Sequence, residues 1–148
     1  MTDIAFHFNA SDKLAYVCRL LRKAVSSGAK VVVSADAPTL QALDTQLWTF
    51  EPLSFLPHGR LDSPPEVLQA SPIVLALGLP DGVVLPHHQV LVNLCAEVQP
   101  AFAQFERTIE VVSLDAQDRE QARARWKHYA AQGYSITRHD LNLRDTAA

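Results

Sequence analysis

Hydrophobic positions along the chain follow two spacings, one typical of strands and one typical of helices. Short runs rich in β-branched and aromatic residues predict strands at residues 4–8, 30–33, 72–77, 90–94, 109–112 and 134–136. Hydrophobic residues at helical spacing predict helices after residue 11, after residue 36 and from residue 115 to about residue 132, with a shorter helix at residues 101–105. The chain therefore alternates between strands and helices.

Residues that favour helix ends support these boundaries. Ser11 is predicted to cap the first long helix, and Gly28 is predicted to end it. Asp115 opens the last helix with Asp118 three residues later, an arrangement similar to a capping box. Gly133 then supplies the residue that ends this helix.

Strands that alternate with helices predict right-handed βαβ units and hence a mostly parallel sheet with helices on both faces. We therefore predict a Rossmann-like three-layer α/β sandwich, in which residues 1–148 form one domain and residues 142–148 a frayed tail. Residues 48–71 contain four prolines. A segment of this length rarely stays without secondary structure in a compact domain, so short local elements are expected there.

Composition narrows the function classes only slightly. The chain is 48% hydrophobic and 20% charged, which is ordinary for a globular protein. It has no apolar run of the ~18 residues that a membrane span needs and no basic secretory leader, so a cytoplasmic protein without membrane contact is expected. Cys18 and Cys95 are expected to be reduced core residues. The net charge of −3 argues against a general nucleic-acid-binding surface but permits a local basic face.

The sequence lacks a recognisable active site. The junction after the first strand, residues 8–12, contains no glycine, so the dinucleotide-binding fingerprint is missing, and no GxxxxGK[ST] motif occurs. His87 and His88 are adjacent and would point in different directions, which favours a solvated loop over a metal site. Cys18 lies on the apolar stripe of its helix, a poor position for a nucleophile. We predict no catalysis, no metal and no cofactor.

The last helix carries the clearest functional pattern. At about 100° per residue, Arg119, Arg123, Trp126 and Lys127 fall within an arc of about 100° on one face. Guanidinium groups pair with carboxylates or phosphates, and an indole supplies an apolar or cation–π wall. The face therefore suits an acidic peptide or a phosphate backbone, and the mildly acidic chain favours the peptide. The structural alternative is a solvated basic helix whose aromatic residues pack on the sheet.

Residues 47–58 concentrate three aromatic residues and two prolines in twelve positions. Prolines lower the conformational entropy of a loop, and Trp and Phe are frequent interface anchors. If exposed, this segment would form a second protein-binding surface. The alternative is that Trp48 and Phe55 pack into the core.

These two segments together resemble the DNA polymerase III chi subunit family. The resemblance rests on LW-x-F-x-P-x-SF-L-PH at residues 47–58, IEVV at 109–112 and R-x-x-x-R-x-R-W-K-x-Y-x-x-x-G-Y at 119–134. Their order and spacing extend it over residues 4 to about 136. It implies a Rossmann-like adaptor without catalysis that is associated with the clamp loader of the replicative DNA polymerase III. The adaptor would link the psi subunit to the acidic C-terminal tail of single-stranded DNA-binding protein.

The resemblance also implies particular site residues. It assigns binding of the tail to Val112, Arg119, Arg123, Trp126, Lys127 and Gly133. In this assignment the cations meet the aspartates and terminal carboxylate of the tail, and its terminal phenylalanine lies beside the valine and the tryptophan. It assigns binding of psi or a related helicase to Trp48, Phe55, Leu56 and Pro57. DNA is contacted indirectly, through single-stranded DNA-binding protein. A direct nucleic-acid-binding module and a nucleotide-binding enzyme stay open as alternatives.

Overall fold

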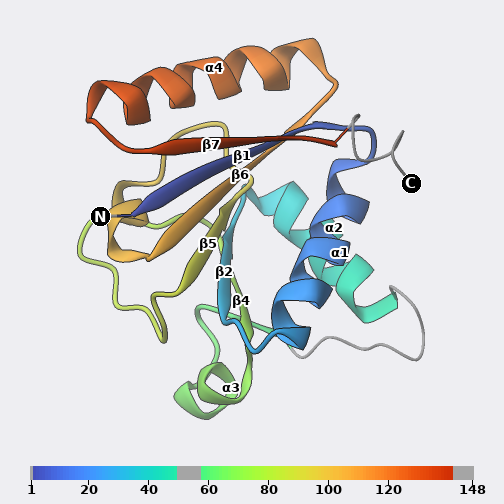
Figure 1. Cartoon of the computed structure of the whole chain (residues 1–148). Helices are drawn as coiled ribbons and strands as arrows, with labels where there is room; N and C mark the ends of the chain where they lie inside the picture. The colour runs from blue at the N-terminus through green and yellow to red at the C-terminus, as the bar shows by residue number, and fades with distance from the viewer. Residues whose placement is uncertain (1, 50–57, 142–148) are drawn as a thin grey trace.

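The computed structural model describes residues 2–49 and 58–141, which form an α/β structure around one sheet (Figure 1). Its strands are β1 (Asp3–Ala10), β2 (Val31–Ser34), β3 (His58–Arg60), β4 (Ile73–Ala76), β5 (Val90–Asn93), β6 (Arg107–Ser113) and β7 (Ile136–Asp140). Its helices are α1 (Lys13–Ser26), α2 (Ala37–Thr49), α3 (Pro65–Ala70), the 3₁₀ helix η1 (Pro100–Gln104) and α4 (Ala116–Ala131). None of these helices is long and apolar enough to cross a bilayer, as judged over the described residues.

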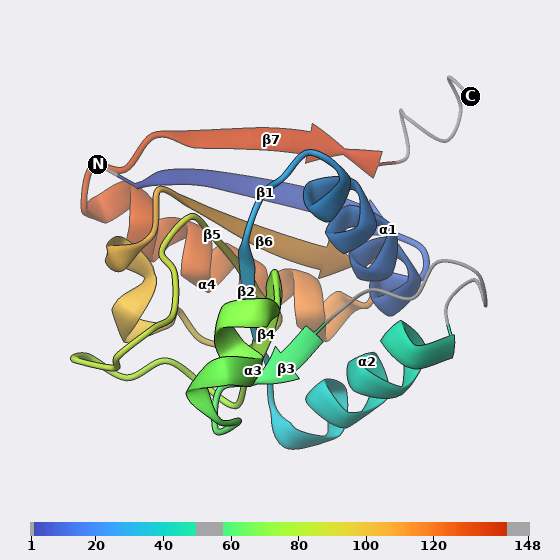
Figure 2. The ribbon, with the colours of Figure 1, turned by 90° about the horizontal axis from the view of Figure 1, so that it is seen from below.

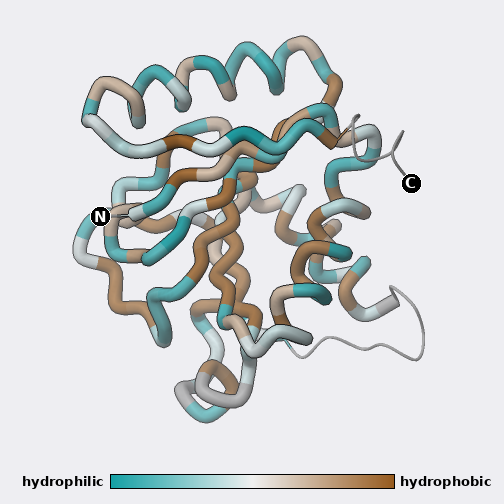
Figure 3. Tube along the Cα trace, viewed as in Figure 1, coloured by the Kyte–Doolittle hydropathy of each residue, from teal (hydrophilic) through white to brown (hydrophobic). Residues whose placement is uncertain are grey.

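The sheet has seven strands in the order β3-β4-β2-β5-β6-β1-β7, and every pair is parallel over the described residues. Helices α1 and α2 lie on one face, and α4 and η1 lie on the other (Figures 1 and 2). Because successive strand residues point to opposite faces, Val31 and Val33 join the core under α1 and α2, whereas Val32 joins the core on the side of α4. Figure 3 shows hydrophobic residues concentrated in the central strands. The predicted three-layer α/β sandwich is confirmed.

The start of the first helix differs from the prediction. Asp12 caps α1 in place of Ser11, because the carboxylate of Asp12 accepts a hydrogen bond from the N–H of Ala15 at 3.1 Å. Strand β1 continues to Ala10, which leaves Ser11 in the bend before the cap. Gly28, with φ of 84°, follows the helix as predicted.

The last strand also differs. It was predicted at residues 134–136 but runs from Ile136 to Asp140. Gly133 ends α4 with φ of 84°, as predicted, and the N–H of Tyr134 still bonds to the carbonyl of Tyr129 at 3.1 Å. Tyr134 therefore belongs to the cap of the helix, and the strand begins two residues later.

Short elements also occur in the proline-rich region, as predicted. Strand β3 forms one edge of the sheet by pairing with β4, and α3 follows it. The first aromatic residue of the region, Trp48, lies in the last turn of α2. Residues 50–57, which include Phe55, Leu56 and Pro57, lie outside the described residues.

The sheet has a topological switch point between β1 and β6. These strands are neighbours, but β1 continues into α1 on one face and β6 continues into α4 on the other. In open α/β sheets such a point opens a crevice beyond the carboxyl ends of the strands. Here the pairing is irregular between His7 and Ala10, and Asn9 adopts a left-handed φ of 66°, which asparagine tolerates better than most residues.

A carboxylate ties the elements together at this end of the sheet. Asp118 in the first turn of α4 accepts hydrogen bonds from the N–H of Ser113 at 2.8 Å and from Lys13 of α1 at 3.1 Å. Burial raises the pKa of the Asp118 carboxyl, but the hydrogen bond from the Ser113 N–H and the charge of the Lys13 ammonium lower it by more than burial raises it. The pKa therefore lies below its ordinary value.

Asp118→Asn should lower the free energy of unfolding by about 1 kcal/mol at neutral pH, because the amide does not pair with Lys13 as a charge. A carboxyl whose pKa is depressed by folding stabilises the protein above its unfolded-state pKa of about 3.9. That contribution is lost as the pH falls through the lower folded-state pKa. Urea denaturation should therefore show a constant difference between the two proteins above about pH 5, and a shrinking difference below about pH 4. A difference that persists undiminished in acid would contradict this account.

Candidate functional site

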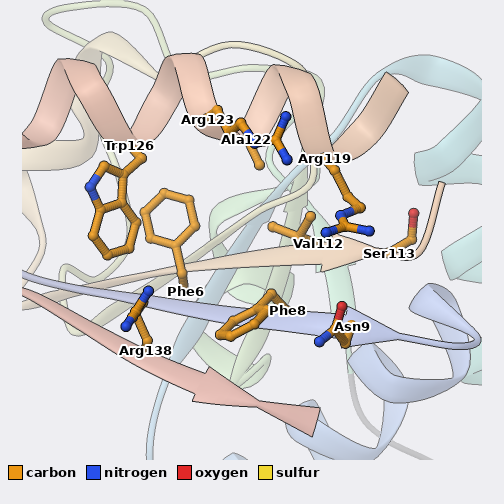
Figure 4. A pocket seen from close by; sticks show the side chains of 10 residues that line it. All are labelled: Phe6, Phe8, Asn9, Val112, Ser113, Arg119, Ala122, Arg123, Trp126 and Arg138. Atoms are coloured by element: carbon orange, nitrogen blue, oxygen red, sulfur yellow. The ribbon is translucent and has the colours of Figure 1, made fainter. Parts of the chain in front are cut away.

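A pocket of about 380 Å³ lies at the carboxyl end of the sheet, between α4 and strands β1, β6 and β7 (Figure 4). Its lining combines aromatic and aliphatic side chains with three arginines. The lining residues are Phe6, Phe8, Asn9, Val112, Ser113, Arg119, Ala122, Arg123, Trp126 and Arg138. The pocket therefore pairs an apolar base with a cationic rim.

The local periodicity of each element explains this lining. Arg119, Arg123 and Trp126 are spaced four and three residues apart, which places them on one face of α4 over successive turns. Phe6 and Phe8 are two residues apart in β1 and point to the same face of the sheet. The structure thus brings together four of the predicted tail-binding residues, Val112 among them.

The aromatic base is held together by ring contacts. The ring centroids of Phe6 and Trp126 are 5.0 Å apart with the planes tilted by 55°. The guanidinium carbon of Arg138 lies 6.0 Å from the centroid of the Trp126 ring, within the range of a cation–π contact. Trp126 is half-buried, so one part of the indole packs on the core and the rest faces the pocket.

The rim of the pocket is strongly positive. Arg119, Arg123 and Arg138 are exposed, and none of them forms an ion pair with a carboxylate among residues 2–49 and 58–141. Three guanidiniums around an apolar base are suited to an anion that also carries an aromatic or aliphatic group.

The two remaining predicted tail-binding residues lie outside the pocket lining. Lys127 is exposed on α4, one residue beyond Trp126, and Gly133 is exposed at the end of the helix. A Cβ atom added at Gly133 would meet nothing within 4 Å. Contacts to these residues would require a ligand that extends along α4 toward its C-terminal end.

Sequence reasoning missed the contribution of strands β1 and β7. Arg138 was not considered because the last strand was predicted to end at residue 136, before the arginine. Phe6, Phe8 and Asn9 were assigned to the first strand and its end without a role. Their alternation in β1 was a usable signal, but placing them beneath α4 requires the knowledge that β1 pairs with β6.

Arg125 has a different role from the other arginines of α4. It is 2% exposed, and its Nε donates to Oε1 of Glu110 at 2.9 Å. The carboxylate of Glu110, which is fully buried in β6, also accepts hydrogen bonds from the hydroxyl of Tyr129 at 2.6 Å and from the amide of Asn93. Burial raises the pKa of Glu110, and these three partners oppose the shift. This network anchors α4 to the sheet. None of its residues lines the pocket, but the ring of Tyr129 meets the pocket residue Phe6 edge to face, with the centroids 6.1 Å apart.

Trp48 is exposed rather than buried in the core. Its side chain is 61% exposed on α2, and its ring centroid lies 5.4 Å from that of His58. Nε2 of His58 is 2.7 Å from the carboxylate of Asp44, which Arg60 also contacts at 3.3 Å. For Trp48, the alternative of packing into the core is wrong.

His87, His88 and the two thiols were the side chains that the sequence offered as candidates for metal binding or nucleophilic chemistry. His87 and His88 lie in a loop, as predicted, and His88 is exposed. His87 is half-buried and its ring nitrogens have no hydrogen-bond partner in the described structure, so the prediction of a solvated loop is wrong for His87 alone. Within the described residues no group of three or more metal-ligating side chains occurs. Burial raises the pKa of Cys18 to about 11, and burial also raises the pKa of Cys95, so neither thiol is poised as a nucleophile.

Comparison with known proteins identifies the family. Residues 1–137 match the family described as DNA polymerase III chi subunit, HolC. The chain belongs to the DNA polymerase III chi subunit family. It is 32% identical over 146 residues to DNA polymerase III subunit chi of Pseudomonas aeruginosa, an alignment that covers 95% of this chain and 98% of the relative. It is 31% identical over 123 residues to the subunit chi of Haemophilus influenzae, which covers 81% of each chain. Family membership connects the chain with DNA replication as an accessory subunit.

Proposed function

We propose that the pocket between α4 and the sheet binds the acidic C-terminal tail of single-stranded DNA-binding protein. The chain then acts as a non-catalytic accessory subunit of the cytoplasmic DNA polymerase III holoenzyme, associated with the clamp loader. It tethers the polymerase to coated single-stranded DNA and contacts DNA only indirectly.

The observation that carries this proposal is the combination, in one pocket, of an aromatic base and three guanidiniums that have no carboxylate partner among the described residues. Arg119, Arg123 and Arg138 match a ligand with several carboxylates, including a free C-terminal one. The space above Phe6 and Val112, beside Trp126, suits one aromatic side chain. A tail of aspartates that ends in phenylalanine carries both features.

A phosphate backbone could pair with the cations, but it has no group that would fill the closed aromatic base of the pocket. Proteins that bind single-stranded nucleic acid combine a basic groove that follows the backbone with several aromatic platforms for successive bases. Here the cations surround a single compact pocket, and the whole chain carries a net charge of −3. These features favour a short acidic peptide.

We also propose that Trp48, together with Phe55, Leu56 and Pro57, which lie outside the described residues, binds the psi subunit or a helicase that takes its place. The support for this assignment is the 61% exposure of a tryptophan at the end of α2. Tryptophan is enriched among the residues that contribute most of the binding energy near the centre of protein interfaces.

A titration with three ligands tests the tail proposal. The ligands are a short aspartate-rich peptide that ends in phenylalanine, the same peptide without its phenylalanine, and bare single-stranded DNA of equal charge. We expect the complete peptide to bind with a roughly micromolar Kd. Removing the phenylalanine should weaken binding at least about tenfold, because the aromatic base then stays empty. Equal affinity for the two peptides, or a preference for the DNA, would overturn the proposal.

Arg138→Ala should weaken binding of the complete peptide by roughly three- to tenfold, because one of the three guanidiniums and its contact with Trp126 are lost. The side chain is exposed on β7, so the thermal midpoint should stay nearly constant. Arg138→Lys keeps the charge and should recover part of the affinity. Unchanged binding by Arg138→Ala would remove β7 from the site.

A further inference from the structure

The pocket between α4 and the sheet has two uncharged polar side chains in its lining, Asn9 and Ser113. The hydroxyl of Ser113 is already engaged, because it donates to Asp118 at 2.9 Å and accepts from the N–H of Asp115 at 3.2 Å. The amide of Asn9 makes one hydrogen bond within the described structure, in which Nδ2 donates to Oδ1 of Asp140 at 2.9 Å. Oδ1 of Asn9 accepts no hydrogen bond from the described residues. Asn9 therefore has an acceptor to offer to a ligand.

The end of β1 turns Asn9 into the pocket. In a regular strand successive side chains point to opposite faces, so Asn9 would point away from the face that Phe8 occupies. Both side chains nevertheless line the pocket. The pairing of β1 with β6 is irregular between His7 and Ala10, and Asn9 has a left-handed φ of 66°. An irregularity of this kind re-aims a side chain, and here it adds a polar group beside the aromatic base.

The contact with Asp140 fixes which way the amide of Asn9 faces. A carboxylate only accepts hydrogen bonds, so the NH₂ group of Asn9 must face Asp140 in β7. A flipped amide would set its oxygen against the carboxylate and lose this hydrogen bond. Figure 4 shows the oxygen of Asn9 directed toward the side of the pocket that α4 forms. Asp140 thus holds the acceptor of Asn9 toward the ligand.

Asn9 and Arg119 lie at the same end of the pocket. Ala10, the neighbour of Asn9, pairs with Ser113 of β6. The N–H of Ser113 in turn bonds at 2.8 Å to Asp118, the residue before Arg119. Both side chains line the pocket, and in Figure 4 the guanidinium of Arg119 lies above the amide of Asn9. This end of the pocket therefore combines a cation with a neutral acceptor.

A guanidinium and an amide oxygen together match the last residue of a peptide. That residue has a carboxylate and a backbone N–H on the same carbon atom. When the carboxylate pairs with Arg119, the N–H can donate to Asn9 while the side chain extends over Phe6 toward Trp126. A phosphodiester or a fatty acid has no N–H at this place and would leave the oxygen of Asn9 without a donor.

We propose that Oδ1 of Asn9 accepts a hydrogen bond from the N–H of the last residue of the bound peptide, and that Asp140 holds the Asn9 amide in this orientation. The inference rests on the proposed tail site and adds to it the side chain that recognises the peptide backbone. Asn9 makes the pocket selective for a C-terminal amino-acid residue over other anions that carry an apolar group.

A peptide that lacks one N–H tests the proposal. In the terminal ester peptide, the amide that joins the last phenylalanine to the residue before it is replaced by an ester, which removes the N–H and keeps the charges and side chains. The control ester peptide has the same replacement at the junction furthest from the C-terminus. Fluorescence anisotropy measures each affinity. We expect the terminal ester to bind the original chain roughly three- to tenfold more weakly than the all-amide peptide, and the control ester less than about twofold more weakly.

Asn9→Gly assigns the effect to Asn9. Glycine adopts a positive φ without strain, so the backbone can keep its course at this position. The variant should bind the all-amide peptide roughly three- to tenfold more weakly than the original chain does, and should bind the terminal ester as tightly as the all-amide peptide. If Asn9 acted only by tethering β7 through Asp140, the variant would weaken both peptides by the same factor, and the ratio of the two affinities would stay as in the original chain.

Asp140→Ala tests the orientation of the amide. The Asn9 side chain remains, but its NH₂ group loses the carboxylate that it faces, so the amide can flip. The ratio of the two affinities should therefore fall between that of the original chain and that of Asn9→Gly. A ratio equal to that of the original chain would overturn the role given to Asp140.

Equal affinity of the original chain for the all-amide and terminal ester peptides would overturn the proposal and leave the tail site intact, because both peptides would still bind. A ratio in Asn9→Gly as large as in the original chain would overturn it too, since the N–H would then donate to another group. If none of the three peptides bound the original chain, the tail site itself would be wrong, and the contact with Asn9 would be wrong with it.

Discussion

Arg125→Ala is expected to lower the free energy of unfolding by about 3–5 kcal/mol, a large part of the stability of a domain of this size. The guanidinium of Arg125 is 2% exposed and lies 2.9 Å from the carboxylate of Glu110, which is fully buried. Its removal leaves a buried carboxylate without its charge partner and frees the carbonyl of Ala96, to which Arg125 also donates at 2.9 Å. Urea denaturation at neutral pH measures the loss.

The same helix provides a matched control. Arg123→Ala removes the same side chain two residues away, but Arg123 is exposed at the pocket and forms no ion pair among the described residues. Its effect on stability should stay within about 0.5 kcal/mol. If the two alanine variants were equally stable, Arg125 would not hold the buried position that the structure gives it.

A double variant separates the charge from the packing. Replacing Glu110 by Gln in the Arg125→Met background removes the unpaired charge while the methionine fills most of the space of the arginine stem. This variant should be more stable than Arg125→Met alone, because an amide is less costly to bury than a carboxylate. A double variant that is less stable than Arg125→Met would show that the carboxylate does not depend on Arg125.

The fold was largely predictable, because its signals are local. Alternation of β-branched runs with amphipathic helices predicts a parallel α/β sandwich whatever the order of its strands. The strand order itself follows from long-range pairing: β1 lies beside β6 and not beside β2, and no local pattern contains that information. The displaced last strand has a local cause, because Tyr134 completes the cap of α4 through its N–H.

The candidate site also has one part that local patterns predict and one part that depends on long-range pairing. Helical periodicity was enough to group Arg119, Arg123 and Trp126 and to exclude Arg125 from their face. It could not predict that Arg125 is buried, since its partner Glu110 lies in another element. A glutamate between β-branched residues in IEVV was a signal for such a partner, because a carboxylate is rarely buried without one. The place of Arg138 at the pocket could not be predicted without the pairing of β7 with β1, because that pairing brings its side chain there.

Arg119→Ala and Arg123→Ala should each weaken binding of the acidic peptide that ends in phenylalanine by roughly 10- to 150-fold. Each arginine offers charge-assisted hydrogen bonds, which contribute about 1.5–3 kcal/mol apiece when they reach a carboxylate. The two side chains are one turn apart on the same rim of the pocket, so their effects should not simply add in the double variant. Fluorescence anisotropy with a labelled peptide measures the affinities.

The loss of peptide affinity should depend on the ionic strength and on which face of the sheet the removed cation occupies. Raising the salt concentration should weaken the original chain more than the double variant, because fewer ionic contacts remain to be screened in the variant. Arg107→Ala is the matched control, since Arg107 is exposed, lies on the other face of the sheet and does not line the pocket, so its loss should leave peptide binding unchanged. Equal losses for Arg107→Ala and Arg123→Ala would mean that the peptide senses only the overall charge of the chain. A loss confined to Arg119 and Arg123 would instead require the pocket as its binding site, because the two sets of variants differ only in the face of the sheet from which a cation is removed.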